Sequence, residues 1–156
     1  MSYSTATAAP ARTPMAAYRY LISLAERIPL SLVQLAARVA IAHVFWNSAQ
    51  SKLASWPVTL QLFAFEYRVP LLPPDLAAIL ATTTELAGAV LVLFGMLTRI
   101  AALALLGVVA VIQLFVFPGH WGEHLLWASL LLLLLARGAG VVSVDHAVKQ
   151  LMSQGR

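Results

Sequence analysis

The sequence predicts an all-α fold: a transmembrane four-helix bundle with short amphipathic segments at the membrane interface. Of the 156 residues, 61% are hydrophobic and only 10% are charged, whereas a soluble domain carries about 25% charged residues. A chain of this size exposes too much surface for a buried core alone to explain so high a hydrophobic fraction. Four apolar stretches also approach the roughly 20 residues that a bilayer span needs. Lipid is therefore the expected solvent for most of the surface.

The N-terminal region divides into two parts. Residues 1–14 are small and polar and include proline, which predicts a disordered tail. Within residues 15–29, apolar side chains such as Met15, Tyr18 and Ile28 recur at helical spacing, while Arg19 and Arg27 fall elsewhere on the helical wheel. This pattern predicts an amphipathic helix that lies on the membrane surface.

Four spans are expected within residues 30–137, at about 30–49, 75–96, 98–117 and 122–136. Almost nothing separates the second span from the third, so these two helices are expected to be antiparallel neighbours. The first loop, 51–74, is amphipathic and aromatic, which predicts an interfacial segment with a helix start at Trp56-Pro57. Residues 138–156 form the predicted C-terminal tail, in which Ser143 or Asp145 caps a short helix over 146–152.

Basic residues indicate the orientation in the membrane. Seven lie on one side of the four-span arrangement and two on the other, with Arg38 inside the membrane. Lys and Arg are enriched on the cytoplasmic side, so both termini are predicted to be cytoplasmic. The positions near helix ends favour lipid headgroups over nucleic acid as the partner of these charges. The larger group comprises Arg12, Arg19, Arg27, Arg99, Arg137, Lys149 and Arg156, and the smaller Lys52 and Arg68.

Two charged residues lie at depths where the membrane should exclude them. Arg38 is about 12 Å into the first span from the cytoplasmic end, and Glu85 is about 15 Å into the second from the outer end. In a hydrocarbon core about 30 Å thick these depths nearly coincide. An unpaired charge there is costly, so Arg38 and Glu85 are predicted to face each other. Two interpretations of this pair have equal weight: it takes part in function, or it is a structural ion pair that only fixes the register of the two helices.

Further polar side chains predict a pocket that opens outward. His43 and Asn47 are one turn apart on the first span, Lys52 continues beyond them, and Gln113 reaches the same level from the third span. The alternative interpretation is that His43 is a packing residue of the helix and belongs to no pocket.

The mouth of this pocket is expected to include His120, Glu123 and His124. These residues spell H-x-x-E-H, a zinc-protease pattern that needs both histidines on one helix. Pro118-Gly119 and Gly122 place His120 in a turn instead. No metal site is therefore predicted, with weak binding of a borderline metal as the alternative.

Several short motifs carry a family resemblance over about residues 30–150. In order they are Arg38, Lys52, Phe65-Glu66-Tyr67-Arg68-Val69-Pro70-Leu71-Leu72-Pro73-Pro74, Glu85-Leu86-Ala87-Gly88, Gly95-Met96-Leu97-Thr98-Arg99, His124-Leu125-Leu126-Trp127-Ala128, Gly138-Ala139-Gly140 and Ser143-Val144-Asp145. In this order and spacing the chain resembles the DoxX family of small four-span membrane proteins. The resemblance implies a theme, redox chemistry at the bacterial inner membrane, rather than a particular reaction.

Three functions follow as hypotheses. The first is a quinone-interacting subunit of a membrane oxidoreductase complex, with Arg38 and Glu85 as catalytic residues and quinone as the cofactor. Because the chain has no cysteine, electrons would need a bound quinone or a partner protein. The quinone would contact six residues: Arg38, His43, Asn47, Glu85, Gln113 and His124.

The second hypothesis is a non-enzymatic anchor or assembly partner for a redox or metal-handling protein. The third is a channel or carrier, which would require an oligomer. Small residues such as Gly88, Ala101, Ala104 and Gly107 permit the close helix contacts of a homo-oligomer.

Overall fold

The computed structural model describes residues 14–155, which form helices joined by short turns, with no strand among them. In chain order the elements are α1 (Pro14–Ala25), α2 (Leu30–Ala54), α3 (Trp56–Gln61), the π-helix η1 (Leu62–Tyr67), α4 (Pro74–Phe94), α5 (Thr98–Val111), the π-helix η2 (Ile112–Val116), α6 (Trp121–Arg137) and α7 (Val144–Gln154). The predicted all-α class is confirmed. The predicted tail 1–14 lies outside the described residues except for Pro14, which begins α1.

Three helices are long and apolar enough to cross a membrane: Leu30–Ala54, Pro74–Phe94 and Thr98–Val116. Helix α6 has only 17 residues, and at 1.5 Å per residue it extends about 26 Å. That length falls short of a hydrocarbon core about 30 Å thick. The apolar helices make this a membrane protein, while the fourth crossing remains a prediction.

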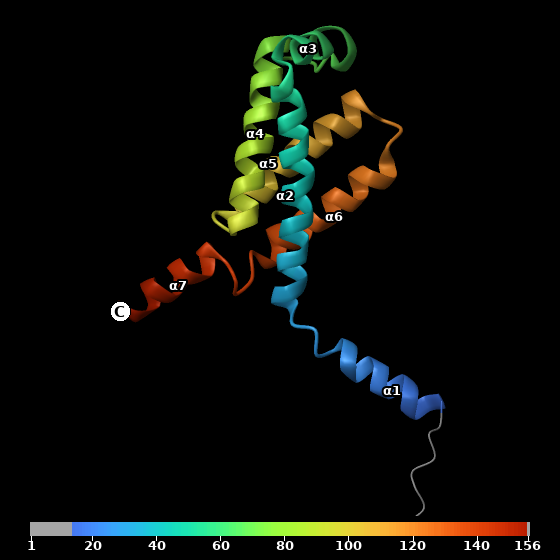
Figure 1. The fold of residues 1–156 in the computed structure, drawn as a ribbon, viewed down its shortest axis with the longest axis vertical. Helices are drawn as coiled ribbons and strands as arrows, with labels where there is room; N and C mark the ends of the chain where they lie inside the picture. The colour runs from blue at the N-terminus through green and yellow to red at the C-terminus, as the bar shows by residue number, and fades with distance from the viewer. Residues whose placement is uncertain (1–13, 156) are drawn as a thin grey trace, which may run out of the picture.

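The four longest helical segments pack in a ring. Helix α2 contacts α4, α4 contacts α5, α5 contacts α6, and α6 contacts α2. Figure 1 shows α2 and α4 side by side, with α5 and α6 crossing beside them. The core between them holds Ile41, Phe45, Leu105, Leu131 and Leu134, each at most 1% exposed. Large apolar side chains also cover the outside, as expected where lipid replaces water.

Small residues allow the helices to approach closely. A Cβ on Gly88 of α4 would lie 2.7 Å from a methyl carbon of Leu105 on α5. Ala37, Ala89, Ala101 and Ala102 are also buried in this core. Close backbone approach is the usual way in which membrane helices gain packing contacts.

The turn between α4 and α5 is tight, as the sequence predicts. Gly95 and Leu97 both adopt the left-handed conformation, with φ of 66° and 49°. A Cβ on Gly95 would lie 2.6 Å from the Cβ of Ser143. Gly95 is therefore required both for its backbone conformation and for the approach of the C-terminal segment.

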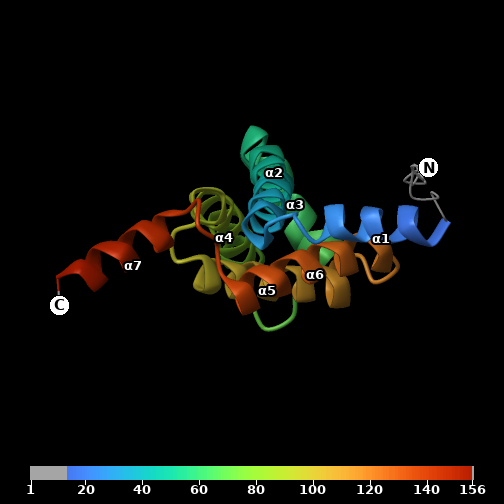
Figure 2. The same ribbon diagram turned by 90° about the horizontal axis from the view of Figure 1, so that it is seen from below.

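Two helices project from the bundle. Helices α1 and α7 contain no buried residue. Figures 1 and 2 show them leaving the same end of the bundle in different directions. Helix α3 and η1 lie at the opposite end, where Pro57 stands in the first turn of α3. The predicted helix start at Trp56-Pro57 is thus confirmed.

Candidate functional site

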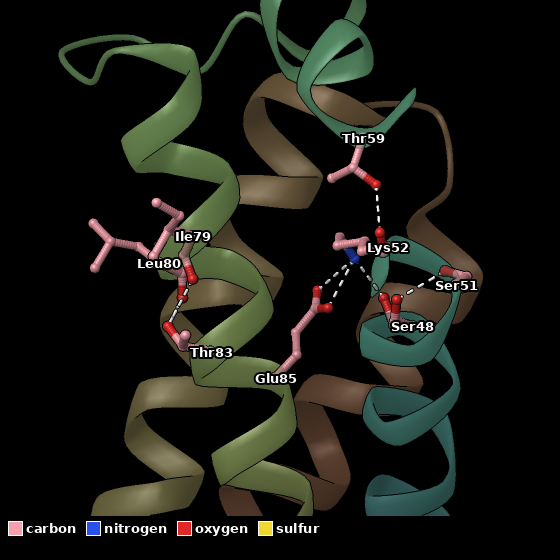
Figure 3. A network of polar contacts seen from close by, with 8 residues as sticks. All are labelled: Ser48, Ser51, Lys52, Thr59, Ile79, Leu80, Thr83 and Glu85. Carbon is pink, nitrogen blue, oxygen red and sulfur yellow. Dashed lines mark hydrogen bonds and ion pairs between the residues drawn. The ribbon is translucent and has the colours of Figure 1, made fainter. Parts of the chain in front are cut away.

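An ion pair between α2 and α4 lies toward the α3 end of the bundle. Lys52 Nζ lies 2.8 Å from Glu85 Oε2 and 3.0 Å from Oε1, and it donates a third hydrogen bond to Ser48 Oγ at 2.8 Å. Figure 3 shows the lysine reaching across to the carboxylate. The side chain of Glu85 is 1% exposed and that of Lys52 17%. These three bonds use all three donors of the ammonium group.

Local structure fixes both partners. Thr59 of α3 is buried, and its hydroxyl donates to the carbonyl oxygen of Lys52 at 2.8 Å, which ties α3 to the last turn of α2 (Figure 3). Ser48 precedes Lys52 by one helical turn, so both lie on the same face of α2. The side chain of Thr83 instead bonds to the carbonyl of Ile79 on its own helix, the self-bonding expected of threonine in a membrane helix.

The ion pair borders a cavity of about 760 Å³. We refer to it as the Lys52–Glu85 cavity. Its walls are mostly apolar, contributed by α2, α3, η1, α4, α5, η2 and α6. A volume of roughly 300–1,000 Å³ with apolar walls and a few polar groups is typical of small-molecule sites. The polar lining residues are Ser48, Ser51, Lys52, Ser55, Thr59, Tyr67, Thr84, Glu85, His120, Glu123 and His124.

A continuous series of rings forms one side of this cavity. Phe63 contacts Tyr67, with ring centroids 5.1 Å apart, and Tyr67 contacts Phe117 at 5.9 Å. The series continues from Phe117 to His120 at 5.4 Å, to His124 at 6.3 Å and to Trp127 at 5.2 Å. Phe45 of α2 completes it, 6.2 Å from Trp127. Such a wall offers flat apolar surfaces to a planar ligand.

Tyr67 belongs to both the ring series and the polar lining. It lies at the end of η1, outside the membrane-spanning helices. Burial raises the pKa of its phenol, and the nearby carboxylates of Glu66 and Glu85 raise it further. The hydroxyl therefore keeps its proton at neutral pH and can donate a hydrogen bond into the cavity.

Gln113 and His124 meet, as the predicted pocket requires. His124 Nδ1 lies 2.6 Å from Gln113 Oε1, and Gln113 Nε2 donates to the carbonyl of Pro118 at 2.8 Å. Both side chains are buried. The π-helix η2 carries Gln113, and π-helical turns are frequent at functional sites. His124 reaches the cavity wall, and Gln113 orients it from behind.

The predicted Arg38–Glu85 pair is wrong. Arg38 Nε donates to the carbonyl of Val92 at 2.9 Å, and its two Nη atoms donate to Leu93, Ala139 and Val142. Arg38 and Glu85 have similar depths along their helices, but their partners lie toward opposite ends of the bundle. The long arginine side chain extends toward the last carbonyls of α4, where a cation complements the helix C-terminus.

His43 and Asn47 do not reach the cavity. Asn47 Nδ2 lies 3.1 Å from His43 Nε2, so the two contact each other, but both side chains are exposed on the outside of α2. Five residues separate Arg38 from His43, a rotation of about 140° at 3.6 residues per turn. The inward face carries Arg38, Phe45, Ser48 and Lys52 instead. The prediction considered only how deep each residue lies along α2. The direction of each side chain around the helix axis places His43 and Asn47 outside the cavity.

The H-x-x-E-H pattern does not form one helical site. His120 is the residue that precedes α6, while His124 is buried within it. Among residues 14–155, no group of three potential metal ligands comes together. The two histidines serve the ring series instead.

The C-terminal segment is locked to the other end of the bundle by contacts that the sequence prediction missed. Asp145 accepts hydrogen bonds from the backbone N–H groups of Leu97 at 2.8 Å and Thr98 at 3.0 Å, so it caps α5 rather than α7. Ser143 caps α7 through the N–H of His146. Gln34 donates to the carbonyls of Arg137 and Gly138.

The charge of Asp145 fits this capping role. Burial by itself would raise the pKa of Asp145, but the hydrogen bonds from Thr98 and Leu97 and the nearby Arg38 guanidinium outweigh burial and lower it. The carboxylate is therefore ionised throughout the neutral range. A negative charge at the start of α5 also complements its helix dipole.

Comparison with known families decides the membership of this chain. The DoxX family model matches residues 33–118, more than half of the sequence, and this region contains Arg38, Lys52 and Glu85. The chain belongs to the DoxX family. The match covers α2 through η2, so the C-terminal segment of this DoxX-family protein lies beyond it. Comparisons with curated proteins and with solved structures gave no match.

Proposed function

We propose that this DoxX-family protein is a quinone-interacting subunit of a membrane oxidoreductase complex, with the quinone held in the Lys52–Glu85 cavity. The observation that carries the proposal is one ion pair, with Glu85 buried and Lys52 partly buried, on the wall of a mostly apolar, ring-lined cavity of about 760 Å³. A quinone has matching chemistry, since its ring is flat and apolar and its two carbonyl oxygens accept hydrogen bonds.

The residues of the cavity fit such a head group. Lys52 donates to a ligand carbonyl by exchanging its bond to Ser48, while Glu85 stays paired with the ammonium. Tyr67 of η1 supplies a second donor, and His124 lies in the ring series between His120 and Trp127. These donors replace Arg38, His43 and Asn47, which the sequence had favoured as quinone contacts.

Proton transfer is the chemistry that these side chains can supply. A bound quinone takes up two electrons and two protons when it is reduced. Lys52 and Glu85 are hydrogen-bonded to each other, so a proton given up by Lys52 can be replaced through Glu85 and Ser48. Electrons would come from a partner protein, because the chain has no cysteine to relay them.

The orientation completes the proposal. Arg99 and Arg137 lie at the end of the bundle from which α1 and α7 project, together with Arg19 and Lys149 on those helices. The positive-inside rule then places this end, and both termini, in the cytoplasm of a bacterial inner membrane. The cavity consequently opens toward the outer leaflet, where a lipid-soluble quinone can enter from the side.

Mass spectrometry of lipid extracts from gently purified protein tests the proposal. Wild type should retain a stoichiometric quinone, and Glu85→Gln should lose at least about 90% of it, because Lys52 loses the carboxylate that holds its ammonium group at the cavity wall. A tenfold loss of affinity corresponds to about 1.4 kcal/mol. Thr83→Val is the matched control, because Thr83 lies on the same helix but faces outward. Equal quinone in the Glu85→Gln protein, or none in wild type, would contradict the proposal.

A second function has one observation in its favour. The apolar residues Val148, Leu151 and Met152 of α7 are exposed, and α7 has no buried residue, as an anchor for a soluble redox or metal-handling protein would require. A photoreactive residue at position 151 should then crosslink to one soluble protein in native membranes. Crosslinks to lipid alone would contradict this function and identify α7 as a membrane-surface helix.

A further inference from the structure

The outer face of α2 carries polar side chains at membrane depth. His43, Asn47 and Gln50 are all exposed there, although α2 is one of the candidate spans. His43 lies about 20 Å from Leu30 and about 17 Å from Ala54 at 1.5 Å per residue, which is near the middle of the helix. Polar groups at such depths normally face a protein partner rather than lipid. Figure 2 shows α2 at the edge of the bundle, away from α5.

The hydrogen bonds on this face are incomplete. His43 Nε2 and Asn47 Nδ2 bond to each other at 3.1 Å. With Nε2 as the acceptor, the neutral imidazole carries its proton on Nδ1. His43 Nδ1 and Asn47 Oδ1 then have no hydrogen-bond partner among residues 14–155. Each copy of the chain therefore has one donor and one acceptor on this face that the described residues leave unpaired. When two identical faces meet, the donor of each can bond to the acceptor of the other.

Sequence spacing gives this face a regular seam. The exposed residues recur at alternating steps of three and four, which is the heptad spacing of a left-handed helix pair. Both alanines are small enough for close approach, and the whole seam is uncharged, so two copies do not repel. Its members are Val33, Ala36, Ala40, His43, Asn47 and Gln50.

We propose that this α2 seam pairs with the α2 seam of a second copy of the chain. Two copies inserted in the same direction have parallel α2 helices, so each seam residue meets its own counterpart across a two-fold axis. Asn47 then occupies an a position of the heptad, where a buried asparagine favours parallel pairs. His43 of each copy donates to Asn47 of the other.

This interface is distinct from the Lys52–Glu85 cavity, because none of the six seam residues lines that cavity. It also differs from the oligomer contact that the sequence suggested. Gly88 and Ala101 are buried inside the bundle, whereas Ala104 and Gly107 are exposed on α5, where they border the cavity. The seam instead uses Ala36 and Ala40, which the bundle leaves exposed.

Disulfide crosslinking tests the pairing directly, because the natural chain has no cysteine. Full-length Ala40→Cys protein, oxidised in its membrane, should form covalent dimers, since facing residues of a helix pair come within the Cα separation that a disulfide allows, about 4.4–6.8 Å. Leu103→Cys is the control: this residue of α5 is 60% exposed but lies on another face. Equal dimer yields from the two variants, or crosslinks of Ala40→Cys only to other proteins, would overturn the proposal.

The polar contacts are tested separately in the same background. Adding Asn47→Ala to Ala40→Cys should lower the dimer yield about three- to tenfold, because two symmetric hydrogen bonds across the pair are lost. The double variant keeps the cavity and its core, so retained quinone or an unchanged melting temperature verifies that it is folded. An unchanged dimer yield in a folded protein would show that His43 and Asn47 do not join the copies.

Discussion

The two ends of the bundle each hold a cation, but in different surroundings. At the α1/α7 end, Arg38 donates to four backbone carbonyls and is enclosed by the C-terminal segment. At the α3 end, Lys52 pairs with Glu85 on the wall of a cavity. Backbone carbonyls are fixed in place and cannot exchange protons, whereas a carboxylate beside open space can do so. We therefore assign structure to the first cation and chemistry to the second.

The largest effect is expected from removing Arg38. Arg38→Leu leaves the carbonyls of Leu93, Ala139 and Val142 without the donor that Arg38 supplies, while Val92 keeps its bond from the N–H of Gly95. Each buried unsatisfied group costs about 1–3 kcal/mol. The free energy of unfolding, measured by SDS titration in bicelles, should fall by about 4 kcal/mol or more. Arg38→Lys should recover only part of this, because an ammonium group cannot match the planar fork. A stable Arg38→Leu protein would contradict the structural role.

Replacing Lys52 should destabilise the protein, and replacing Glu85 as well should restore most of the lost stability. Lys52→Met leaves Glu85 buried without a counter-charge and should cost about 3 kcal/mol. Lys52→Met/Glu85→Met removes both charges and should recover most of that stability, but the protein should bind no quinone. The same unfolding titration, together with quinone analysis, checks both variants. If the double variant is as unstable as Lys52→Met, the pair itself is structural and the contrast between the two ends fails.

The smallest effect is expected at Gly95, in the turn between α4 and α5 beside Arg38. Gly95→Ala places a methyl group 2.6 Å from Ser143 and 2.9 Å from the guanidinium carbon of Arg38, at a φ of 66°. It should cost about 2 kcal/mol, the usual range for alanine at a left-handed glycine in a packed site. Gly107→Ala is the matched control, since nothing lies within 4 Å of its added methyl. The thermal midpoint should drop for Gly95→Ala and be maintained for Gly107→Ala.

The helices could be predicted from the sequence because their cause is local. Long apolar runs and the Pro118-Gly119 break place α2, α4, α5 and α6 without knowledge of their neighbours. Trp56-Pro57 and Ser143 likewise mark helix starts through short-range chemistry. The family resemblance rested on similar short motifs.

The site could be predicted only in part, because its contacts are distant in sequence. The prediction included Glu85 and His124 in the site and Lys52 at the outer end of the pocket, but it paired Glu85 with Arg38 and did not include the ring series. A count of fourteen residues from Arg38 to Lys52, close to four whole turns, shows that both lie on one face of α2. That signal was present in the sequence. The capping of α5 by Asp145 had no such signal in the sequence, because 47 residues separate Thr98 from Asp145.

The partners of Arg38 also bear on how the chain is made. Two of its four acceptors, Ala139 and Val142, follow it by 101 and 104 residues. A chain still emerging from the ribosome holds this arginine in the membrane before those carbonyls have been translated. The segment that contains Ala139 and Val142 must therefore be synthesised before the hydrogen bonds of Arg38 are complete, so this end of the bundle cannot close while only the first span is in the membrane.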